Sequence, residues 1–251
     1  MKPPQLDWTK LKVYPLAERQ SLTAVDGVLI SPEAGPAPLP ETAKKQVRAC
    51  AAQIRAARAR NSAVILMYGA HLLRNGAALV LDRMMERGWL THLATNGAGT
   101  IHDWEYAWLG RSTESVRNNV KTGTFGAWDE TGRNIMLALL AGGVRGEGYG
   151  TSLGRFIQED GATLPSQDAL AASIRENPGD PLSPARATLL RIMREYDFPA
   201  GRIQVEHHWK QASVLAQAFR RGVPVTVHPG IGYDIIANHP IFDGGAVGRA
   251  G

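Results

Sequence analysis

Blocks of apolar and polar residues along the chain predict helices and strands in a regular order. Apolar residues recur at helical spacing over residues 41–60, with basic side chains along one flank, and predict an amphipathic helix. The run SAVILMY at 62–68 is short and continuously apolar, which is typical of a strand buried on both faces of a parallel sheet. A helix over 71–88 that ends at Gly88, and a second strand over 90–96, follow.

The same order returns later in the chain. A helix over 99–110 is predicted, with Thr100 as its N-cap, and a helix over 209–222 leads into a strand over 223–228. Strands and helices that alternate with short links are typical of parallel βαβ units. The predicted fold class is therefore α/β, with a mainly parallel, doubly wound sheet.

Two long segments depart from this order. Residues 1–40 hold seven of the fifteen prolines and predict an extended arm, outside an α/β domain over 41–251. Residues 112–200 are mostly helical by pattern and predict a helical insertion. Three core strands are predicted, with one further strand in the arm and one near 203–207.

Composition and charge narrow the classes of protein. The 251 residues are 44% hydrophobic, enough to fill a substantial core. The net charge is +5, and the basic residues are scattered among acidic ones and form no block. The sequence therefore gives little support for nucleic acid as a partner. No run has the length of a membrane helix or of a signal peptide core, so we expect no membrane partner. The single cysteine, Cys50, indicates a reducing compartment, and we expect a cytoplasmic protein.

Loops that follow the predicted strands are where ligands bind in open parallel sheets. They cover 68–76, 95–103 and 228–239. In the second loop, small residues from Asn96 to Gly99 let backbone amides approach a phosphate at a helix N-terminus. A plain tight turn has the same pattern, and both interpretations stay open.

Ionisable residues open the helix after this loop. His102 and Glu105 are three apart and share a face, so an imidazole and a carboxylate can converge on one ligand. In the alternative interpretation, Asp103 and Glu105 complement the helix dipole, and His102 caps or packs.

A third group of candidates surrounds the last predicted strand. His228, Asp234 and His239 carry the ligand types of zinc or iron and suit a metal-dependent hydrolase. Their spacing matches no metal signature, so this function is kept as an alternative.

Taken in order, three segments resemble deoxyhypusine synthase and its bacterial relatives. They read SAVILMYGAHLLRNG, MMERGWLTHLATNGAGTIHDWEYAWLG and GVPVTVHPGIGYDIIANHP, and lie within residues 60–110 and 205–240. The resemblance implies a Rossmann-like domain that binds NAD in a homo-oligomer, a tetramer with sites between subunits. It also implies a transferase that removes a hydride from an amine or polyamine, forms an imine and passes the group to a second amine.

The resemblance also implies site residues by position. Those expected at the cofactor are Ala70, Leu72, Asn96, Gly97, Ala98, Asp103 and Asp234, and the residues expected at the substrate as catalytic groups are His102 and His71. The sequence departs from the family at Ile101 and His102, where the family is more acidic. The family's imine-forming lysine lies after the position of 228–240, where this chain has only IFDGGAVGRAG. An inactive or truncated NAD-binding or assembly protein of the same fold is therefore a further alternative.

Overall fold

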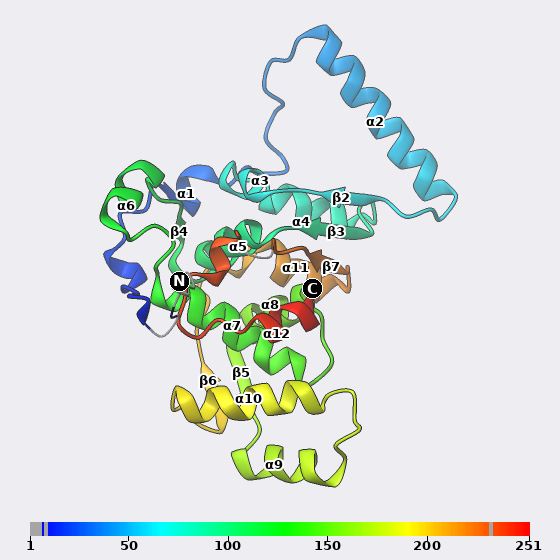
Figure 1. Ribbon diagram of the computed structural model, residues 1–251. Coiled ribbons are helices and arrows are strands. Elements are labelled where there is room, and N and C mark those ends of the chain that lie inside the picture. The colour runs from blue at the N-terminus through cyan, green and yellow to red at the C-terminus, as the bar shows by residue number, and fades with distance from the viewer. Residues whose placement is uncertain (1–6, 8–9, 231–232) are drawn as a thin grey trace, which may run out of the picture.

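The computed structural model describes Asp7, residues 10–230 and residues 233–251, and shows a mixed α/β molecule (Figure 1). Parts of the predicted arm (1–6 and 8–9) and of the third loop (231–232) lie outside the described residues. The strands are β1 (Thr23–Ala24), β2 (Ile65–Met67), β3 (His92–Thr95), β4 (Arg111–Ser112), β5 (Gly161–Leu164), β6 (Gly201–Gln204) and β7 (Val225–Val227). The α-helices are α1 (Val25–Val28), α2 (Glu41–Ala59), α3 (Ala70–Arg74), α4 (Ala78–Glu86), α5 (Gly97–Leu109), α6 (Val116–Thr122), α7 (Asp129–Gly143), α8 (Tyr149–Gln158), α9 (Gln167–Glu176), α10 (Ser183–Glu195), α11 (Val214–Arg221) and α12 (Gly244–Ala250). Short 3-10 helices are η2 (Leu16–Glu18), η3 (Lys210–Ala212) and η4 (Ile235–Ala237).

A three-stranded parallel sheet has the order β2-β3-β7. Leu66 lies opposite Leu93 and Leu93 opposite Val225, so these three side chains share one face. This inner face packs against a cluster from α4 and α11 that includes Leu81 and Val214. The parallel α/β order predicted from the sequence is confirmed.

The outer face of the sheet is open. Ile65 and Met67 share this face with Ala94, and their exposed fractions are 58% and 81%. The sequence interpretation of 62–68 as a strand buried on both faces is therefore wrong. An unbroken apolar run does not reveal whether a helix lies on each side of a strand.

The helix predicted over 71–88 is broken into α3 and α4. Gly76 lies between them with φ of +83°, and a Cβ atom there would overlap the backbone carbonyl of Val28. The N-terminal segment thus crosses close to this point, and only glycine allows both the turn and the contact. The apolar spacing on both sides of the break still fits one helix, which is why the sequence predicts a single element.

Helix α5 is the central element of the fold. Its N-cap is Asn96, whose side-chain oxygen accepts a hydrogen bond from Gly99 N at 2.9 Å, and it ends at Gly110 in the left-handed region. The predicted cap, Thr100, lies inside the helix and donates to the carbonyl of Gly97.

Asp103 joins α5 to the beginning of α11. Its carboxylate accepts hydrogen bonds from Ser213 Oγ, from Val214 N at 2.6 Å and from Leu215 N at 3.3 Å. The side chain is buried, and this burial raises its pKa to about 7, although these hydrogen bonds act in the opposite direction. Asp103 therefore caps the beginning of α11 together with Ser213, the N-cap residue of that helix.

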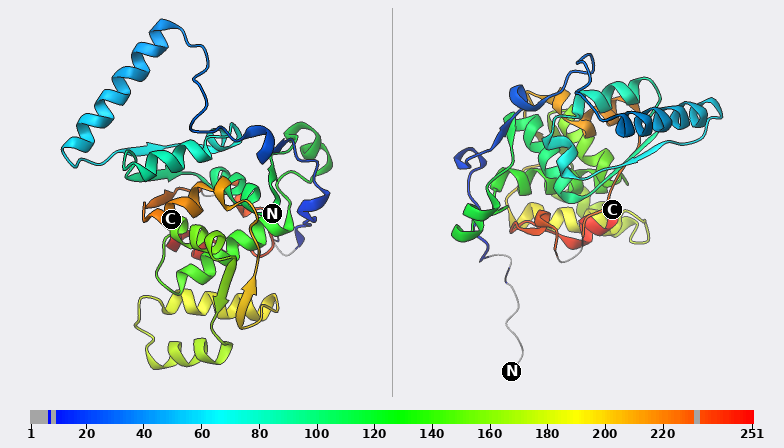
Figure 2. Two further views of the ribbon diagram at one scale, coloured as in Figure 1. Left: turned by 180° about the vertical axis from the view of Figure 1, so that it is seen from behind. Right: turned by 90° about the horizontal axis from the view of Figure 1, so that it is seen from above.

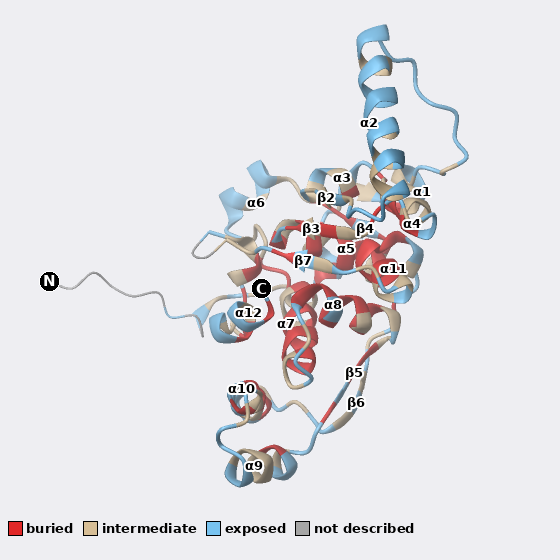
Figure 3. Ribbon diagram, turned by 90° about the vertical axis from the view of Figure 1, so that its right-hand side faces the viewer, coloured by how far each residue is buried: buried red, intermediate tan, exposed pale blue. Residues whose placement is uncertain are grey.

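The predicted helical insertion contains the largest core. Residues 134–142 of α7 are all buried, and α7 packs against α8 and α10 (Figure 3). Gly154 of α8 lets the carbonyl of Leu215 approach, because a Cβ atom there would lie 2.5 Å from that oxygen. The segment also holds β4 and β5. β5 pairs with β6 in an antiparallel sheet, so the strand predicted near 203–207 exists at 201–204.

The predicted arm forms short elements instead of lying fully extended. β1 pairs with β4 in antiparallel orientation, and much of the apolar stretch at 24–30 becomes α1. The helix predicted over 41–60 is present as α2, but none of its residues is buried, and it stands away from the body (Figures 1 and 2). Among the described residues, no helix combines the length and hydropathy needed to cross a membrane.

A buried histidine lies where α5 meets α8. The His207 ring makes edge contacts with Trp104 and Phe156, and its Nδ1 lies 3.6 Å from an Asp160 carboxylate oxygen. Burial lowers the pKa of His207 to about 4, against the attraction of Asp160. The imidazole is therefore neutral in the folded protein at pH 7.

Replacing Asp103 with alanine tests its capping role. Asp103→Ala leaves three buried donors without their acceptor, and we expect the free energy of unfolding to fall by about 3 kcal/mol. Ser166→Ala removes an ordinary cap of α9 and should cost only about 1 kcal/mol. Urea denaturation followed by circular dichroism measures both. Equal losses would show that Asp103 is no more than a surface cap.

The stability contributed by His207 depends on pH. The unfolded chain binds this proton near pH 6.5 and the folded chain only near pH 4, so the contribution is complete above pH 6.5 and is lost as pH falls toward 4. The difference in unfolding free energy between wild type and His207→Phe should fall by about 3 kcal/mol over that range. The difference isolates His207 from Asp103, whose raised pKa acts with opposite sign. His208→Phe removes the exposed neighbouring ring and is the matched control for loss of a histidine side chain.

Candidate functional site

An open depression lies at the carboxyl ends of β2, β3 and β7. It has a volume of about 540 Å³ and is lined by Met67, Tyr68, Gly69, Ala94, Thr95, Asn96 and His228. We call it the strand-end crevice. It brings together the beginnings of all three loops singled out in the sequence, at the edge of the sheet where ligands bind in parallel α/β folds.

The glycines of the second loop have a steric reason. A Cβ atom at Gly97 would overlap the Asp234 carboxylate, and one at Gly99 would lie 2.2 Å from Thr95 Oγ1. The third loop therefore brings an acid to the beginning of α5. This placement supports the tight-turn interpretation, and a phosphate at the same helix end would be repelled by Asp234.

A second cavity, open to solvent on one side, lies between α3, α5 and the segment 113–128. It has a volume of about 310 Å³, and we call it the α3–α5 cavity. Its lining is Arg19, Ala70, His71, Arg74, Ala98, Ile101, His102, Glu105, Thr113, Glu114, Val116, Phe125, Gly126, Trp128, Thr131 and Ile235. Both histidines expected at the substrate therefore face one cavity.

A chain of hydrogen bonds connects His102 to a buried carboxylate. Ser112 Oγ donates to Glu105 Oε2 at 2.6 Å, and His102 Nδ1 lies 2.7 Å from the same hydroxyl. Because the hydroxyl proton goes to Glu105, Nδ1 of His102 carries the proton that bonds to Ser112. The lone pair of His102 then lies on Nε2. The convergence of His102 and Glu105 predicted from their spacing occurs, but through Ser112.

The other side of Glu105 is also saturated. Arg19 Nη1 lies 2.7 Å from Oε1 in a fully buried ion pair, and Thr131 Oγ1 donates to the same oxygen at 2.9 Å. Burial lowers the pKa of His102, and the nearby cations Arg19, Arg74 and His71 lower it further, against the attraction of Glu105. His102 is therefore neutral at pH 7 and able to accept a proton.

The remaining acidic and basic side chains of the cavity differ in whether they have partners within the protein. Glu114 accepts hydrogen bonds from Gly126 N at 3.1 Å, from Trp128 Nε1 at 3.0 Å and from the Asn119 amide. Arg74 and His71 are exposed on α3, and neither has an ion pair among the described residues. The acids of this cavity are thus occupied, whereas two of its basic side chains remain available to a ligand.

The structure separates the residues expected at the cofactor. Ala70 and Ala98 line the α3–α5 cavity, whereas Asn96 lines the strand-end crevice. Leu72 packs against the hydrophobic cluster below α4. The expectation for Asp103 needs correction, because its side chain is buried and its oxygens are used by α11.

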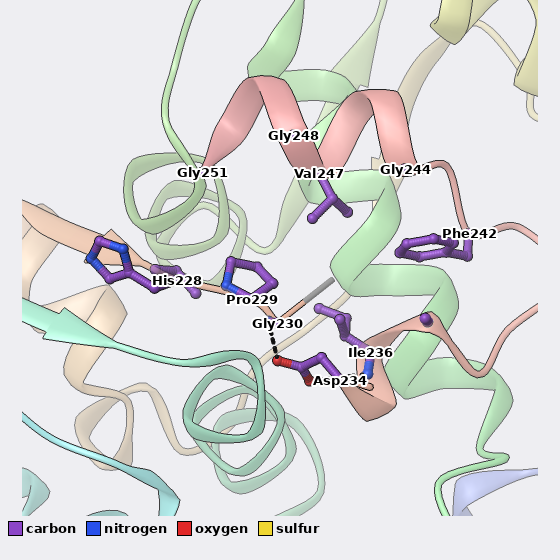
Figure 4. Close-up of a pocket in the computed structure, with 12 residues that line it drawn as sticks. His228, Pro229, Gly230, Asp234, Ile236, Phe242, Gly244, Val247, Gly248 and Gly251 are labelled. Carbon is purple, nitrogen blue, oxygen red and sulfur yellow. Dashed lines mark hydrogen bonds between the residues drawn. The ribbon is translucent and has the colours of Figure 1, made fainter. Parts of the chain in front are cut away.

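Asp234 also takes part in its own loop. Its carboxylate accepts hydrogen bonds from Gly230 N at 3.3 Å and from Ile236 N at 3.4 Å (Figure 4). It borders a third cavity of about 550 Å³ between this loop and α12, lined mostly by apolar groups such as Phe242 and Val247. That cavity presents a single acid and no basic side chain other than His228.

The residues of the metal alternative have separate partners. His228 lies 2.9 Å from Thr226 Oγ1, and Figure 4 shows its ring directed away from Asp234. His239 Nε2 lies 3.2 Å from Asp129 Oδ1, which holds the pKa of Asp129 at about 2. Within the described part of the chain, no three His, Cys, Asp or Glu side chains are grouped to hold a metal ion.

Several residues of the cavity could not be found from sequence. Arg19, Ser112 and Thr131 reach Glu105 from three separate segments. Arg74 lies within the first loop, 68–76. Its basic side chain three residues after His71 is the one feature of the sequence that could have marked it as a candidate.

Comparison with known proteins assigns no family to this chain. No protein-family model matches the sequence, and no curated protein matches it. The geometry of the crevice and the cavity is therefore what bears on function.

The tautomer of His102 can be measured directly. In ¹⁵N-labelled protein we expect the Nδ1-protonated form of His102 near pH 7, with a pKa below the ordinary 6.5. Ser112→Ala removes the acceptor and should abolish this tautomer preference. Ser115→Ala, which alters only the cap of α6, should leave the imidazole signals unchanged. A dominant Nε2-protonated form in wild type would contradict the hydrogen-bond chain.

Proposed function

We propose that this protein is an NAD-dependent transferase that acts on a primary amine. The observation that carries the proposal is the neutral His102, held in one tautomer beside the carboxyl edge of a parallel α/β sheet. A base in that position suits the removal of a proton while a hydride leaves the neighbouring carbon. The resemblance to the deoxyhypusine synthase family, with its Rossmann-like fold, points to the same chemistry.

The strand-end crevice has groups that fit part of NAD. The hydroxyls of Tyr68 and Thr95 are buried there and make no hydrogen bond of normal geometry to the described residues. Asp234, which lies beside Gly97 and lines the neighbouring third cavity, is the type of group that binds ribose hydroxyls in dinucleotide folds. Because its charge opposes a phosphate, the ribose and not the diphosphate belongs at this point. NAD, when bound, supplies the acceptor for a hydride.

His102 moves the proton in the proposed reaction. Its Nε2 takes a proton from the amine nitrogen as the adjacent carbon loses a hydride, and a C=N bond forms. A second amine then adds to the imine carbon, and the first nitrogen leaves as ammonia. Return of the hydride completes the transfer without net oxidation. In the proposed reaction the transfer runs directly between two free amines.

The charges of the α3–α5 cavity favour a particular kind of amine. Arg74 would repel a polyamine, and Glu105 and Glu114 each already accept three hydrogen bonds within the protein. The Arg74 guanidinium would hold a carboxylate or phosphate. The substrate we propose is therefore an amine that also carries an acidic group.

Binding and turnover can be tested separately. Saturating NAD should raise the melting temperature by about 5 °C, the shift expected for a ligand at about 100 times its Kd. The secondary-amine product, followed by mass spectrometry, should form faster with 4-aminobutyrate or ornithine than with spermidine. His102→Gln should keep the thermal shift and lose turnover. Arg74→Gln should raise the KM for 4-aminobutyrate more than tenfold, whereas Arg175→Gln on the distant α9 should not.

Each alternative gives a different result. No thermal shift with NAD would overturn the proposed function. A shift without a transfer product from any amine would leave an NAD-binding or assembly protein. Stoichiometric zinc or iron in the purified protein, with hydrolase activity lost in Asp234→Ala, would favour the metal-dependent hydrolase.

A further inference from the structure

The open face of the parallel sheet and the detached helix α2 are two exposed apolar surfaces on the same chain. The face consists of Ile65, Met67 and Ala94, with His92 opposite Ile65 on β3 and Thr226 beside them on β7. We call it the open sheet face. Sheets with only parallel strands are normally covered by helices on both faces, so this surface is expected to have a partner.

Helix α2 has the matching character. Ala43, Val47, Cys50, Ile54 and Ala57 fall on one side of its 19 residues, and Val47 is 58% exposed. Figure 3 draws α2 mostly pale blue; of these five residues Val47 and Cys50 are exposed and the other three are half-buried. A helix of this length spans about 28 Å, enough to cross three strands that lie about 4.8 Å apart.

The chain's own α2 is held away from the open sheet face. Arg58 Nε donates to the carbonyl of Gly88 at 2.7 Å, and Arg58 Nη1 donates to that of Ser62 at 2.6 Å. Asn61 follows in the left-handed region, with φ of 53°. These contacts fix the direction in which α2 leaves the body, so its own helix reaches the face only if they break.

Two copies could meet through their α2 helices, or through α2 of one copy and the open sheet face of the other, and charge favours the second arrangement. Helix α2 carries five basic side chains and one acidic side chain, a net charge of +4, so two α2 helices packed together would repel each other. The open sheet face has no Asp, Glu, Lys or Arg on its three strands. An apolar helix side therefore meets a face without Asp, Glu, Lys or Arg, and most of the basic side chains stay in solvent.

We propose that α2 of a second copy of this chain packs on the open sheet face, and that the exchange is reciprocal. Each copy then contributes one helix and one face, which is the self-complementary arrangement of a two-fold dimer. A stable interface typically buries about 1,600 Å² in total, and the exchange divides this between two equivalent contacts. The inference is independent of the proposed function, because it uses none of the catalytic side chains.

Disulfide trapping tests the identity of the occupant. Cys50 is the only thiol of the chain and is exposed on the apolar side of α2. A second cysteine is introduced on the open sheet face by Met67→Cys or, in a separate variant, by Ile65→Cys two residues earlier on β2. In at least one of these variants, mild oxidation should produce a covalent dimer on a denaturing gel. Wild type, and Cys50→Ala combined with Met67→Cys, should remain monomeric. An internal Cys50 disulfide that leaves the chain monomeric, or no disulfide in either variant, would overturn the proposal.

Solution mass provides a second readout. Light scattering should give at least twice the chain mass of 27.1 kDa for wild type. Val47→Asp and Met67→Asp should each return the protein to the single-chain mass with an unchanged circular dichroism spectrum. Val120→Asp is the matched control, since Val120 on α6 is 59% exposed and lies outside both surfaces. A monomeric wild type, or equal loss of mass in the control, would contradict the exchange.

Discussion

The surroundings of the candidate site depend on one buried carboxylate, that of Glu105. Arg19 comes from the N-terminal segment, Ser112 from β4 and Thr131 from α7, and all three bond to it. Removing a partner of a fully buried ion pair leaves an uncompensated charge, which is far more costly than the pair itself is stabilising. The carboxylate therefore fixes the walls of the α3–α5 cavity, and through Ser112 it also fixes which nitrogen of His102 carries a proton.

The periodicity of apolar residues predicted where helices and strands lie better than it predicted which segments pack against them. β3, β7 and the end of α11 at Gly222 follow directly from apolar runs and a left-handed cap. The break at Gly76 and the open face at Met67 could not be predicted, because each depends on a segment distant in sequence. The doubly wound, Rossmann-like form remains a prediction, since the described sheet has three strands.

The candidate site was predictable only as far as local spacing reaches. His71 and His102 were identified because they open helices after predicted strands, and they do line one cavity. Asp103 has the same local signal, yet it points to the other side of α5 and caps α11. Neighbouring residues on a helix point about 100° apart, so sequence proximity to a catalytic candidate does not place a side chain in the same site.

The interface and the candidate site are physically connected. Met67 and Ala94 belong to the open sheet face and also line the strand-end crevice. A helix packed on that face would form a wall of the crevice and exclude water from one side of it. Electrostatic interactions within the crevice would then strengthen, because fewer water molecules screen them. Assembly of two copies would in this way change the affinity of the crevice for a ligand without moving any side chain of the α3–α5 cavity.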